Sequence, residues 1–432
     1  MKILEVLDTF YPSFDGPINV IVNLAKILNQ KKLAEVELLV PDNPSNRVEV
    51  EGVKIHRSPS INGPEGYQAA VPFLSSKTRK IIKEGGFDLI HVHSPFTLGK
   101  FAIEVAKKAK IPTMITIHTK YKDDFERILK TKFMRDFMMK YIMSTINKAD
   151  YVLSVSNGAA DVVKSYGYKG ENIYVIRNGT DLVPHDVDPE LIAQVKKEYK
   201  IKDEFVFLFV GRLVSVKNVQ FSLQALSKLK ESGVKNFKFL IVGSGDYEDN
   251  LRELTEELNL NNEVIFTGKV LDREKLAAIY NSSDLFLFPS TFDTCGIVVI
   301  EAAANKLPCV VLKDSCPAEM VKDGVSGFIL PLEVEAWVEC FKKVVENRGE
   351  QAKMKEAALE KIYISWEKVS REYLKFYKDV LGGRVAPSLI SAKAKRAQKR
   401  KTQKINKSVR QRLKSLKKQL AKEKPKRKPK KK

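Results

Sequence analysis

Short apolar runs alternate with longer amphipathic stretches through the first part of the chain. The stretches 17–31 and 98–109 carry apolar residues at helical spacing. Buried strands that alternate with helices are typical of a parallel sheet covered on both faces. The apolar runs expected to form these strands are residues 3–7, 36–40, 88–92, 113–117, 151–155 and 173–176.

The same pattern begins again after Asn178-Gly179. Helical spacing recurs at 219–230 and 247–258, and this repetition predicts two doubly wound α/β units in tandem. The turn residues Val183-Pro184-His185 mark the expected seam, so we divide the chain into domains 1–183 and 184–365. The second set of expected strands is 205–210, 237–242, 263–267, 284–288, 309–312 and 328–330.

Ligands of open α/β sheets bind beyond the carboxyl ends of the strands. Two such sheets that face each other would leave a cleft between the domains, lined by the loops that follow the strands. An amphipathic stretch, 366–382, comes after the second unit and ends at Gly382-Gly383, a plausible helix stop.

The charge of the chain is concentrated at its C-terminal end. A net charge of +22 would suggest that the fold itself binds nucleic acid or a membrane if the charge were spread over the whole chain. Residues 391–432 contain 21 Lys and Arg and a single acid, Glu423, whereas the first 390 residues contain 54 basic and 52 acidic residues. The excess therefore belongs to a basic tail, 383–432, and the folded part is close to neutral.

The cysteines and the hydropathy indicate a reducing compartment. The four cysteines lack CxxC spacing, which argues against a disulfide framework or a zinc site. The N-terminus enters an apolar strand directly, and no stretch approaches 18 uninterrupted apolar residues. We expect a cytoplasmic protein that lies peripherally on the inner face of the cell membrane.

The segment that begins at Gly211 carries the most informative charges. Gly211-Arg212-Leu213 follows an expected strand, and Lys217 lies five positions after Arg212, in front of an expected helix. Two cations beside a helix N-terminus form a natural clamp for a diphosphate. Alternatively, Arg212 and Lys217 are solvated loop charges.

A second informative segment runs from Asp293 to Glu301. Asp293 and Thr294 are suited to cap a helix, which would leave the N–H groups of Gly296 and Ile297 free to bind an anion. Glu301 lies among apolar residues and needs a partner, for which a ribose diol or a lysine would be suitable. The alternative is a capped core helix with one structural ion pair.

Histidines follow two of the expected strands of the first domain. His118 comes after residues 113–117 and is expected to point into the cleft. His91 and His93 alternate onto one face, but no third metal ligand is apparent, so we interpret them as cleft-lining or structural. The only Asp-x-Asp, Asp186-Val187-Asp188, falls in the expected linker, which argues against a carboxylate-bound metal.

These motifs together resemble the glycosyltransferase family 4 of GT-B enzymes, in order and in spacing, up to about residue 381. The resemblance implies a GT-B fold with the acceptor bound mainly by the first domain and the nucleotide sugar by the second. It also implies that the helix 366–382 crosses back to the first domain. The motifs that carry the resemblance are Gly211-Arg212-Leu213, Lys217, Val242-Gly243-Ser244-Gly245 and the segment from Asp293 to Glu301.

The resemblance also implies roles for single residues. Arg212 and Lys217 would neutralise the leaving diphosphate, Glu301 would hold the ribose, and His118 would lie near the transferred sugar. Asp293 stands in place of the first Glu of the family's Glu-x7-Glu signature, one methylene shorter. The expected catalytic residues are His118, Arg212, Lys217 and Asp293. The expected donor-binding residues are Gly16, Gly211, Arg212, Lys217, Gly243, Gly245, Asp293, Gly296, Ile297 and Glu301.

Two shorter segments are similar to the diacylglycerol glucosyltransferase branch, namely His93-Ser94-Pro95-Phe96 and residues 118–125. The resemblance implies a retaining, metal-independent hexosyltransferase that needs no cofactor. Its co-substrate would be UDP-glucose or another UDP- or GDP-hexose, and its acceptor a membrane lipid, such as diacylglycerol, or a cell-envelope glycan. The rival is a catalytically silent GT-B domain that acts as an anchored binding protein. An NAD-linked oxidoreductase is disfavoured because no G-x-G-x-x-G follows the first strand.

The basic tail has a pattern of its own. Its aliphatic residues at helical spacing predict a cationic amphipathic helix suited to an anionic membrane surface. The last residues, 424–429, cannot continue this helix and are expected to be disordered. Nucleic acid is the less favoured partner because the tail has no aromatic residue to stack on bases. A solubilising tail is the remaining alternative. The aliphatic stripe consists of Ile405, Val409, Leu413, Leu416 and Leu420.

Overall fold

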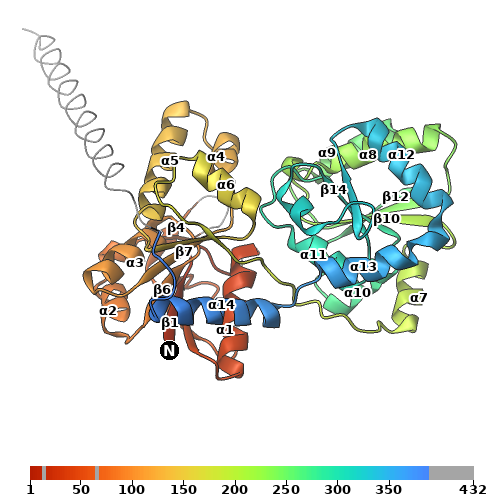
Figure 1. Cartoon of the computed structure of the whole chain (residues 1–432). Coiled ribbons are helices and arrows are strands. Elements are labelled where there is room, and N and C mark those ends of the chain that lie inside the picture. The colour runs from red at the N-terminus through yellow and green to blue at the C-terminus, as the bar shows by residue number, and fades with distance from the viewer. Residues whose placement is uncertain (12–15, 64–67, 389–432) are drawn as a thin grey trace, which may run out of the picture.

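The computed structural model describes residues 1–11, 16–63 and 68–388 and has two α/β lobes (Figure 1). The first lobe is built on a parallel seven-stranded sheet with the strand order β3-β2-β1-β6-β7-β8-β9. β4 and β5 form a small antiparallel sheet of their own. The strands are β1 (Lys2–Val6), β2 (Glu35–Pro41), β3 (Lys54–Ser58), β4 (Ser60–Asn62), β5 (Gln68–Ala70), β6 (Leu89–Val92), β7 (Thr113–Ile117), β8 (Tyr151–Ser154) and β9 (Tyr174–Val175).

Helices cover both faces of this sheet, and they form two apolar clusters, one on each side. The strands β1, β6, β7 and β8 are buried almost throughout, as expected for the centre of a parallel sheet. The helices are α1 (Gly16–Gln30), η2 (Pro72–Leu74), α2 (Ser76–Glu84), α3 (Thr97–Lys108), α4 (Tyr121–Ile128), α5 (Lys132–Ile146) and α6 (Asn157–Ser165).

The second lobe contains a parallel six-stranded sheet with the order β12-β11-β10-β13-β14-β15. Its core is a single large cluster with a high content of phenylalanine, centred on β10 and β13. The strands are β10 (Phe205–Val210), β11 (Phe237–Val242), β12 (Val264–Gly268), β13 (Leu285–Phe288), β14 (Cys309–Leu312) and β15 (Gly327–Leu330). The helices are α7 (Pro189–Glu198), η3 (Ser215–Lys217), α8 (Val219–Glu231), α9 (Glu248–Glu257), α10 (Arg273–Asn281), α11 (Ile297–Ala304), η4 (Cys316–Met320), α12 (Val334–Glu346), η5 (Arg348–Gln351) and α13 (Ala352–Ile362).

Each apolar run of the sequence lies on a strand of one of these two sheets, so the expected pair of doubly wound units is confirmed. The sequence pattern missed β3 and the β4–β5 hairpin. β3 is an edge strand with the polar sequence Lys-Ile-His-Arg-Ser and is only partly buried, so it lacks the apolar signal of a central strand.

The last helix, α14 (Trp366–Leu381), leaves the second lobe and packs on α1 of the first (Figure 1). Its apolar face belongs to the same cluster as β1 and α1. The chain passes between the lobes twice, and the two connecting segments pair through a parallel bridge between Thr180 and Ser365, in which the Thr180 N–H donates to Ile364 O at 3.1 Å and the Trp366 N–H donates to Thr180 O at 3.3 Å.

The four cysteines are free, and all four are buried. No helix in the described part of the chain is both long and apolar enough to cross a bilayer. The expected helix and disordered end of the basic tail, residues 391–432, lie outside the described residues.

Candidate functional site

The two lobes touch through the loops that follow their central strands. The hydroxyl of Thr294, after β13, donates to His118 O after β7 at 2.6 Å, and the Ser156 hydroxyl after β8 donates to Thr294 O at 2.6 Å. Lys120 Nζ donates to Thr291 O at 2.9 Å. These residues define the interlobe junction, which lies at the carboxyl ends of both sheets, where ligands of such folds bind.

A carboxylate of the second lobe caps a helix of the first. Glu319 accepts hydrogen bonds from the Asn157 N–H at 2.9 Å and from the Gly158 N–H, at the first turn of α6. The positive end of the helix dipole and the negative side chain attract each other. Glu319 belongs to η4, so this contact is a further part of the interlobe junction.

Two helix N-termini lie close together at the junction. A methyl group in place of the Gly16 hydrogen, at the start of α1, would lie 4.0 Å from Cδ1 of Ile297, the first residue of α11. Gly296 is the N-cap of α11 in the left-handed conformation, with φ of 73°. Since the first N–H groups of a helix have no intrahelical acceptors, α11 presents a site suited to an anion.

The expectation that Asp293 or Thr294 caps α11 is wrong, because neither side chain bonds to the helix. Thr294 instead contacts His118 O across the junction. Asp293 is bound by Lys217, whose Nζ lies 2.6 Å and 2.7 Å from the two carboxylate oxygens. The N-cap of α11 is Gly296 instead. Its backbone is left-handed, a conformation that glycine adopts without steric cost.

Lys217 ends the short turn η3, between β10 and α8, and it is largely buried with 17% of its side chain exposed. The following residue, Asn218, has a φ of 60° and donates from its side chain to Pro289 O at 3.4 Å. The loops after β10 and β13 are thereby held together. The sequence-based interpretation of Lys217 as a solvated loop charge is excluded.

Arg212 differs from Lys217 in its surroundings. It is exposed and, within the described residues, forms no ion pair. Burial raises the pKa of Asp124 in α4, and the nearby positive charges of Arg127 and Arg212 oppose this shift. Arg212 therefore faces the first lobe across the junction and is available to a ligand.

The glycines after β10 and β11 bring two loops into close contact. A Cβ on Gly243, which has a φ of 142°, would lie 1.9 Å from Gly211 O, and a Cβ on Gly245 would lie 2.1 Å from Leu213 O. The Leu213 N–H donates to Ser244 O at 3.0 Å. Gly211, Gly243 and Gly245 thus have a packing role, which fixes the loop that carries Arg212.

Glu301 of α11 has two protein partners. Arg273 of α10 donates from Nη2 to Oε1 at 3.0 Å, and the Tyr280 hydroxyl donates to Oε2 at 3.2 Å. Burial raises the pKa of Glu301, and the charge of Arg273 opposes this shift. The sequence missed Arg273 because it comes from another helix. Arg273 also pairs with Asp181 of the chain connection between the lobes, so Glu301 is tied to that connection.

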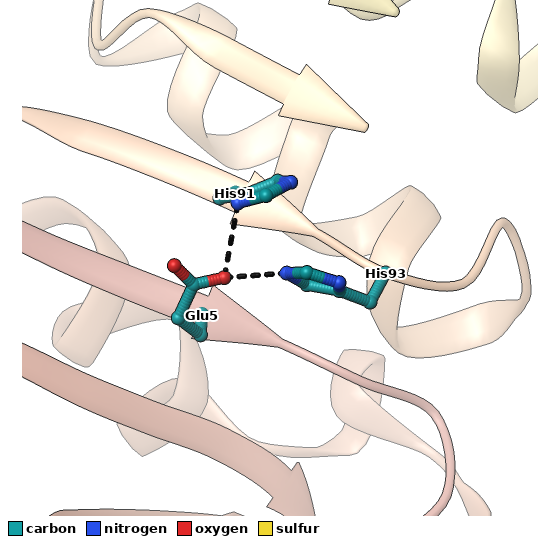
Figure 2. A group of neighbouring side chains, drawn as sticks. All are labelled: Glu5, His91 and His93. Carbon is teal, nitrogen blue, oxygen red and sulfur yellow. Dashed lines mark hydrogen bonds and ion pairs between the residues drawn. The ribbon is translucent and has the colours of Figure 1, made fainter. Parts of the chain in front are cut away.

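His118 lies at the junction with 8% of its surface exposed, and its Nε2 is 2.9 Å from Nδ1 of His93. Behind it, His93 Nε2 and His91 Nδ1 both face one oxygen of Glu5, at 2.6 Å and 3.1 Å (Figure 2). Glu5 is the third group that was not apparent in the sequence; the three potential ligand atoms lie within 4.8 Å of one another. His91 and His93 are fully buried and line no surface.

Asp8, after β1, is a further polar residue that the sequence analysis missed. Its carboxylate accepts from the Leu98 and Gly99 N–H groups of α3, at 2.6 Å and 3.1 Å, and from the Ser94 hydroxyl at 2.7 Å. The signal in the sequence that could have identified Asp8 is its position as a polar residue soon after the first buried strand. Asp8 holds the segment His93-Ser94-Pro95-Phe96 at the carboxyl end of the sheet.

Two family models match the chain. Residues 14–183 match the model described as Glycosyltransferase Family 4, and residues 192–361 match Glycosyl transferases group 1. Among solved structures, Anabaena HepE in complex with UDP-glucose covers 88% of this chain and 100% of its own, with a TM-score of 0.69 and 20% identity. The fold is thus that of the GT-B glycosyltransferases.

Sequence relatives agree with the family models. The alpha-monoglucosyldiacylglycerol synthase of Streptococcus pneumoniae is 28% identical over 343 residues, which cover 76% of this chain and 74% of that protein. The enzyme of the same name from Acholeplasma laidlawii is 28% identical over 346 residues, covering 76% of this chain and 84% of that protein. The chain belongs to glycosyltransferase family 4 and matches its diacylglycerol glucosyltransferase-like branch.

Proposed function

We propose that the protein transfers a hexose from a nucleotide diphosphate sugar to a hydroxyl group of a membrane lipid, with retention of configuration and without a metal ion. UDP-glucose is the first candidate donor, and another UDP- or GDP-hexose is the alternative. Diacylglycerol or its glucosylated form is the first candidate acceptor, and a cell-envelope glycan precursor is the second. The names of the sequence relatives from S. pneumoniae and A. laidlawii support the lipid acceptor.

The observation that carries the donor proposal is the grouping of positive charge beside one helix end. Arg212 is exposed toward the junction, Lys217 lies beside Asp293, and the free N–H groups of α11 begin at Ile297. Departure of a nucleoside diphosphate develops negative charge, which preorganised cations and helix N–H groups stabilise. This grouping supports catalysis that uses side chains in place of a bound cation.

A surface of the first lobe supports peripheral attachment to a membrane. Large apolar side chains are exposed at the end of α4 and on the first turns of α5, with Phe133 at 80% and Phe137 at 59% exposure. Exposed lysines flank them. Apolar side chains interleaved with cations are suited to an anionic bilayer surface, such as the inner face of a cell membrane. We name this surface, formed by Ile128, Lys130, Lys132, Phe133, Met134, Phe137 and Lys140, the α4–α5 patch.

The test of the activity is transfer of labelled hexose from a panel of UDP- and GDP-sugars into vesicles that contain diacylglycerol or its monoglucosylated form. We expect turnover with one donor, an axial (α) anomeric linkage in the product by NMR, and no loss of rate in EDTA. A β-linked product, or a rate abolished by EDTA and restored by Mg²⁺ or Mn²⁺, would contradict the corresponding part of the proposal.

A catalytically silent binding protein is the second candidate, and one observation favours it. Both acidic residues of the signature are already neutralised within the protein, Asp293 by Lys217 and Glu301 by Arg273. A thermal-shift screen separates the two candidates. Stabilisation by nucleotide sugars without release of any nucleoside diphosphate, with every acceptor tested, would establish the silent protein.

A further inference from the structure

The buried polar groups behind His118 form one continuous hydrogen-bonded chain across two strands and one distant helix. Glu5 comes from β1, His91 and His93 from the end of β6, and Tyr377 from α14. The Tyr377 hydroxyl donates to Glu5 Oε1 at 2.9 Å and contacts His91 Nδ1 at 2.7 Å. Glu5, His91 and Tyr377 are completely shielded from solvent. Such a network is costly unless every member has a partner, and each of these has one.

The proton positions follow from the acceptor capacity of Glu5. Burial raises the pKa of Glu5, but the positive charges that His91 and His93 carry at low pH, together with their hydrogen bonds, outweigh burial and hold the pKa of Glu5 well below its usual value. Glu5 is therefore an anion that only accepts, and His93 must donate to it from Nε2. Burial lowers the pKa of His93 to about 4, so at neutral pH its other ring nitrogen, Nδ1, is an acceptor.

The same reasoning extends to His118. His93 Nδ1 accepts, so His118 must donate to it from Nε2. Burial, with His93 and His91 nearby, holds the pKa of His118 well below its ordinary value, which makes a second ring proton unfavourable. Nδ1 of His118 is then left as a bare acceptor, and within the described residues it has no hydrogen-bond partner.

We propose that Glu5 and His93 are positioning residues that fix the Nε2–H tautomer of His118, so that His118 presents an unprotonated Nδ1 to a hydroxyl group of the transferred sugar. The part that concerns the sugar rests on the proposed function. The network also keeps His118 neutral, so that no cation stands beside the sugar ring as positive charge develops on it. Tyr377 connects this hydrogen-bonded network to α14, and its hydroxyl group holds the carboxylate of Glu5 from the side opposite His93.

A bound metal ion is the competing interpretation of Glu5, His91 and His93 (Figure 2). The nitrogens that would ligate it already face partners: His93 Nε2 is 2.6 Å from Glu5 Oε2, and His91 Nδ1 is 2.7 Å from the Tyr377 hydroxyl. A metal would have to displace the proton of His93 that the network requires. The two interpretations therefore predict different protonation of the same nitrogen.

The experiment is a long-range ¹H–¹⁵N correlation spectrum of the full chain labelled with ¹⁵N-histidine, recorded without substrate between pH 6 and 8. We expect His93 and His118 as neutral Nε2–H tautomers across this range, and no stoichiometric metal by elemental analysis. An Nδ1–H tautomer of His118, a cationic His118 at pH 7, or one equivalent of metal would overturn the proposal. This result needs no transferase activity, so it stands apart from the proposed function.

Variants of Glu5 separate positioning from general support of the fold. Glu5→Met removes the acceptor, so His93 moves its proton to Nδ1, the tautomer of His118 reverses, and kcat falls about tenfold with little change of the donor KM. Glu5→Gln keeps an oxygen acceptor and should restore the tautomer and most of the rate. Thr116→Val, which removes the partner of His91 Nε2 and leaves Glu5, His93 and Tyr377 in place, is the matched control. Equal impairment by Glu5→Met and Glu5→Gln, or an unchanged tautomer in Glu5→Met, would refute positioning. Correct tautomers without any turnover would refute the transferase proposal alone.

Discussion

The ammonium group of Lys217 lies within 2.7 Å of both carboxylate oxygens of Asp293, so the cation expected to hold a diphosphate already has an anionic partner. The two residues come from the loops after β10 and β13 and hold these loops together. A donor diphosphate would compete with Asp293 for the same charge. Arg212, which has no such partner in the described residues, would be the first cation to meet the donor.

The cations should be essential for turnover. We expect Lys217→Ala and Arg212→Ala each to lower kcat by about 10²–10³, because preorganised charge at the leaving group is lost, while the fold persists. Steady-state kinetics with the best donor, together with circular dichroism, measure this. Lys228→Ala is the control, since that lysine lies exposed on α8 and pairs with Glu231. Near-normal rates in both site variants would refute the clamp.

Asp293 should oppose the binding of the nucleotide product. Asp293→Asn removes a negative charge beside Lys217, and we expect UDP to bind about tenfold more tightly, an effect of about 1.4 kcal/mol. Isothermal titration calorimetry measures the dissociation constant. Asp293→Glu, which keeps the charge, should bind UDP as the unchanged protein does. Weaker binding by Asp293→Asn would mean that the carboxylate does not lie beside the diphosphate.

The buried histidines should make the protein sensitive to acid. The pKa of His93 is about 4 and that of His118 lies well below 6.5, so between pH 6.5 and 4 the unfolded chain takes up protons that the folded protein does not. The stability that depends on these two histidines is complete above pH 6.5 and falls with decreasing pH, for His93 by about 1.4 kcal/mol per unit until its pKa is reached. Denaturant unfolding at several pH values measures this slope.

Two variants check this assignment. His93→Asn should flatten the slope between pH 6.5 and 4. His185→Ala should leave this slope nearly unchanged, because a backbone hydrogen bond to Val183 O and the carboxylate of Glu274 raise the pKa of the exposed His185, so its contribution to stability is lost only as the pH rises above 6.5. A slope that His93→Asn leaves unchanged would assign the acid sensitivity to other groups.

The close contact of the glycine loops should be intolerant of a methyl group. Gly243→Ala would place Cβ 1.9 Å from Gly211 O and force a non-glycine residue to a φ of 142°. Backbone strain of this kind costs about 1–3 kcal/mol, and the overlap adds to it. We expect a Tm several degrees lower and reduced donor binding, since the loop of Arg212 is displaced. Gly349→Ala, which has no heavy atom within 4 Å of its Cβ, should have a normal Tm.

The α4–α5 patch and the tail should contribute separately to membrane binding. Phe133→Ser and Phe137→Ser each remove an exposed aromatic side chain, and we expect about tenfold weaker binding to anionic vesicles for each. Deletion of residues 391–432 should weaken binding further and reduce its dependence on salt, to which the lysines of the α4–α5 patch still contribute. Co-sedimentation with anionic and with neutral vesicles measures both. Equal binding by the shortened chain would exclude the tail as an anchor, and binding of RNA in preference to vesicles would assign it to nucleic acid.

The sequence predicted the two sheets because their central strands are buried on both faces and therefore appear as continuous apolar runs. It did not predict β3, whose edge position permits polar residues. At the site, it identified residues by their position after strands, but not their partners. Lys217 meets Asp293 and Glu301 meets Arg273 only after the loops and helices pack, across 76 and 28 residues of chain. Glu5 was overlooked because a single acid in an apolar strand gives no periodic signal.

The crossing of α14 has a consequence for any attempt to divide the molecule. Tyr377 supplies a donor to Glu5 from 372 residues away in the chain. An N-terminal half that ended near residue 183 would expose the apolar face of α1 and β1 and leave a buried carboxylate with one donor fewer. Such a fragment should be prone to aggregation, and co-expression with a peptide spanning 366–381 should rescue its solubility. Chimaeras made from this protein and its relatives should likewise fold only when the N-terminal and C-terminal ends of the chain come from the same parent protein.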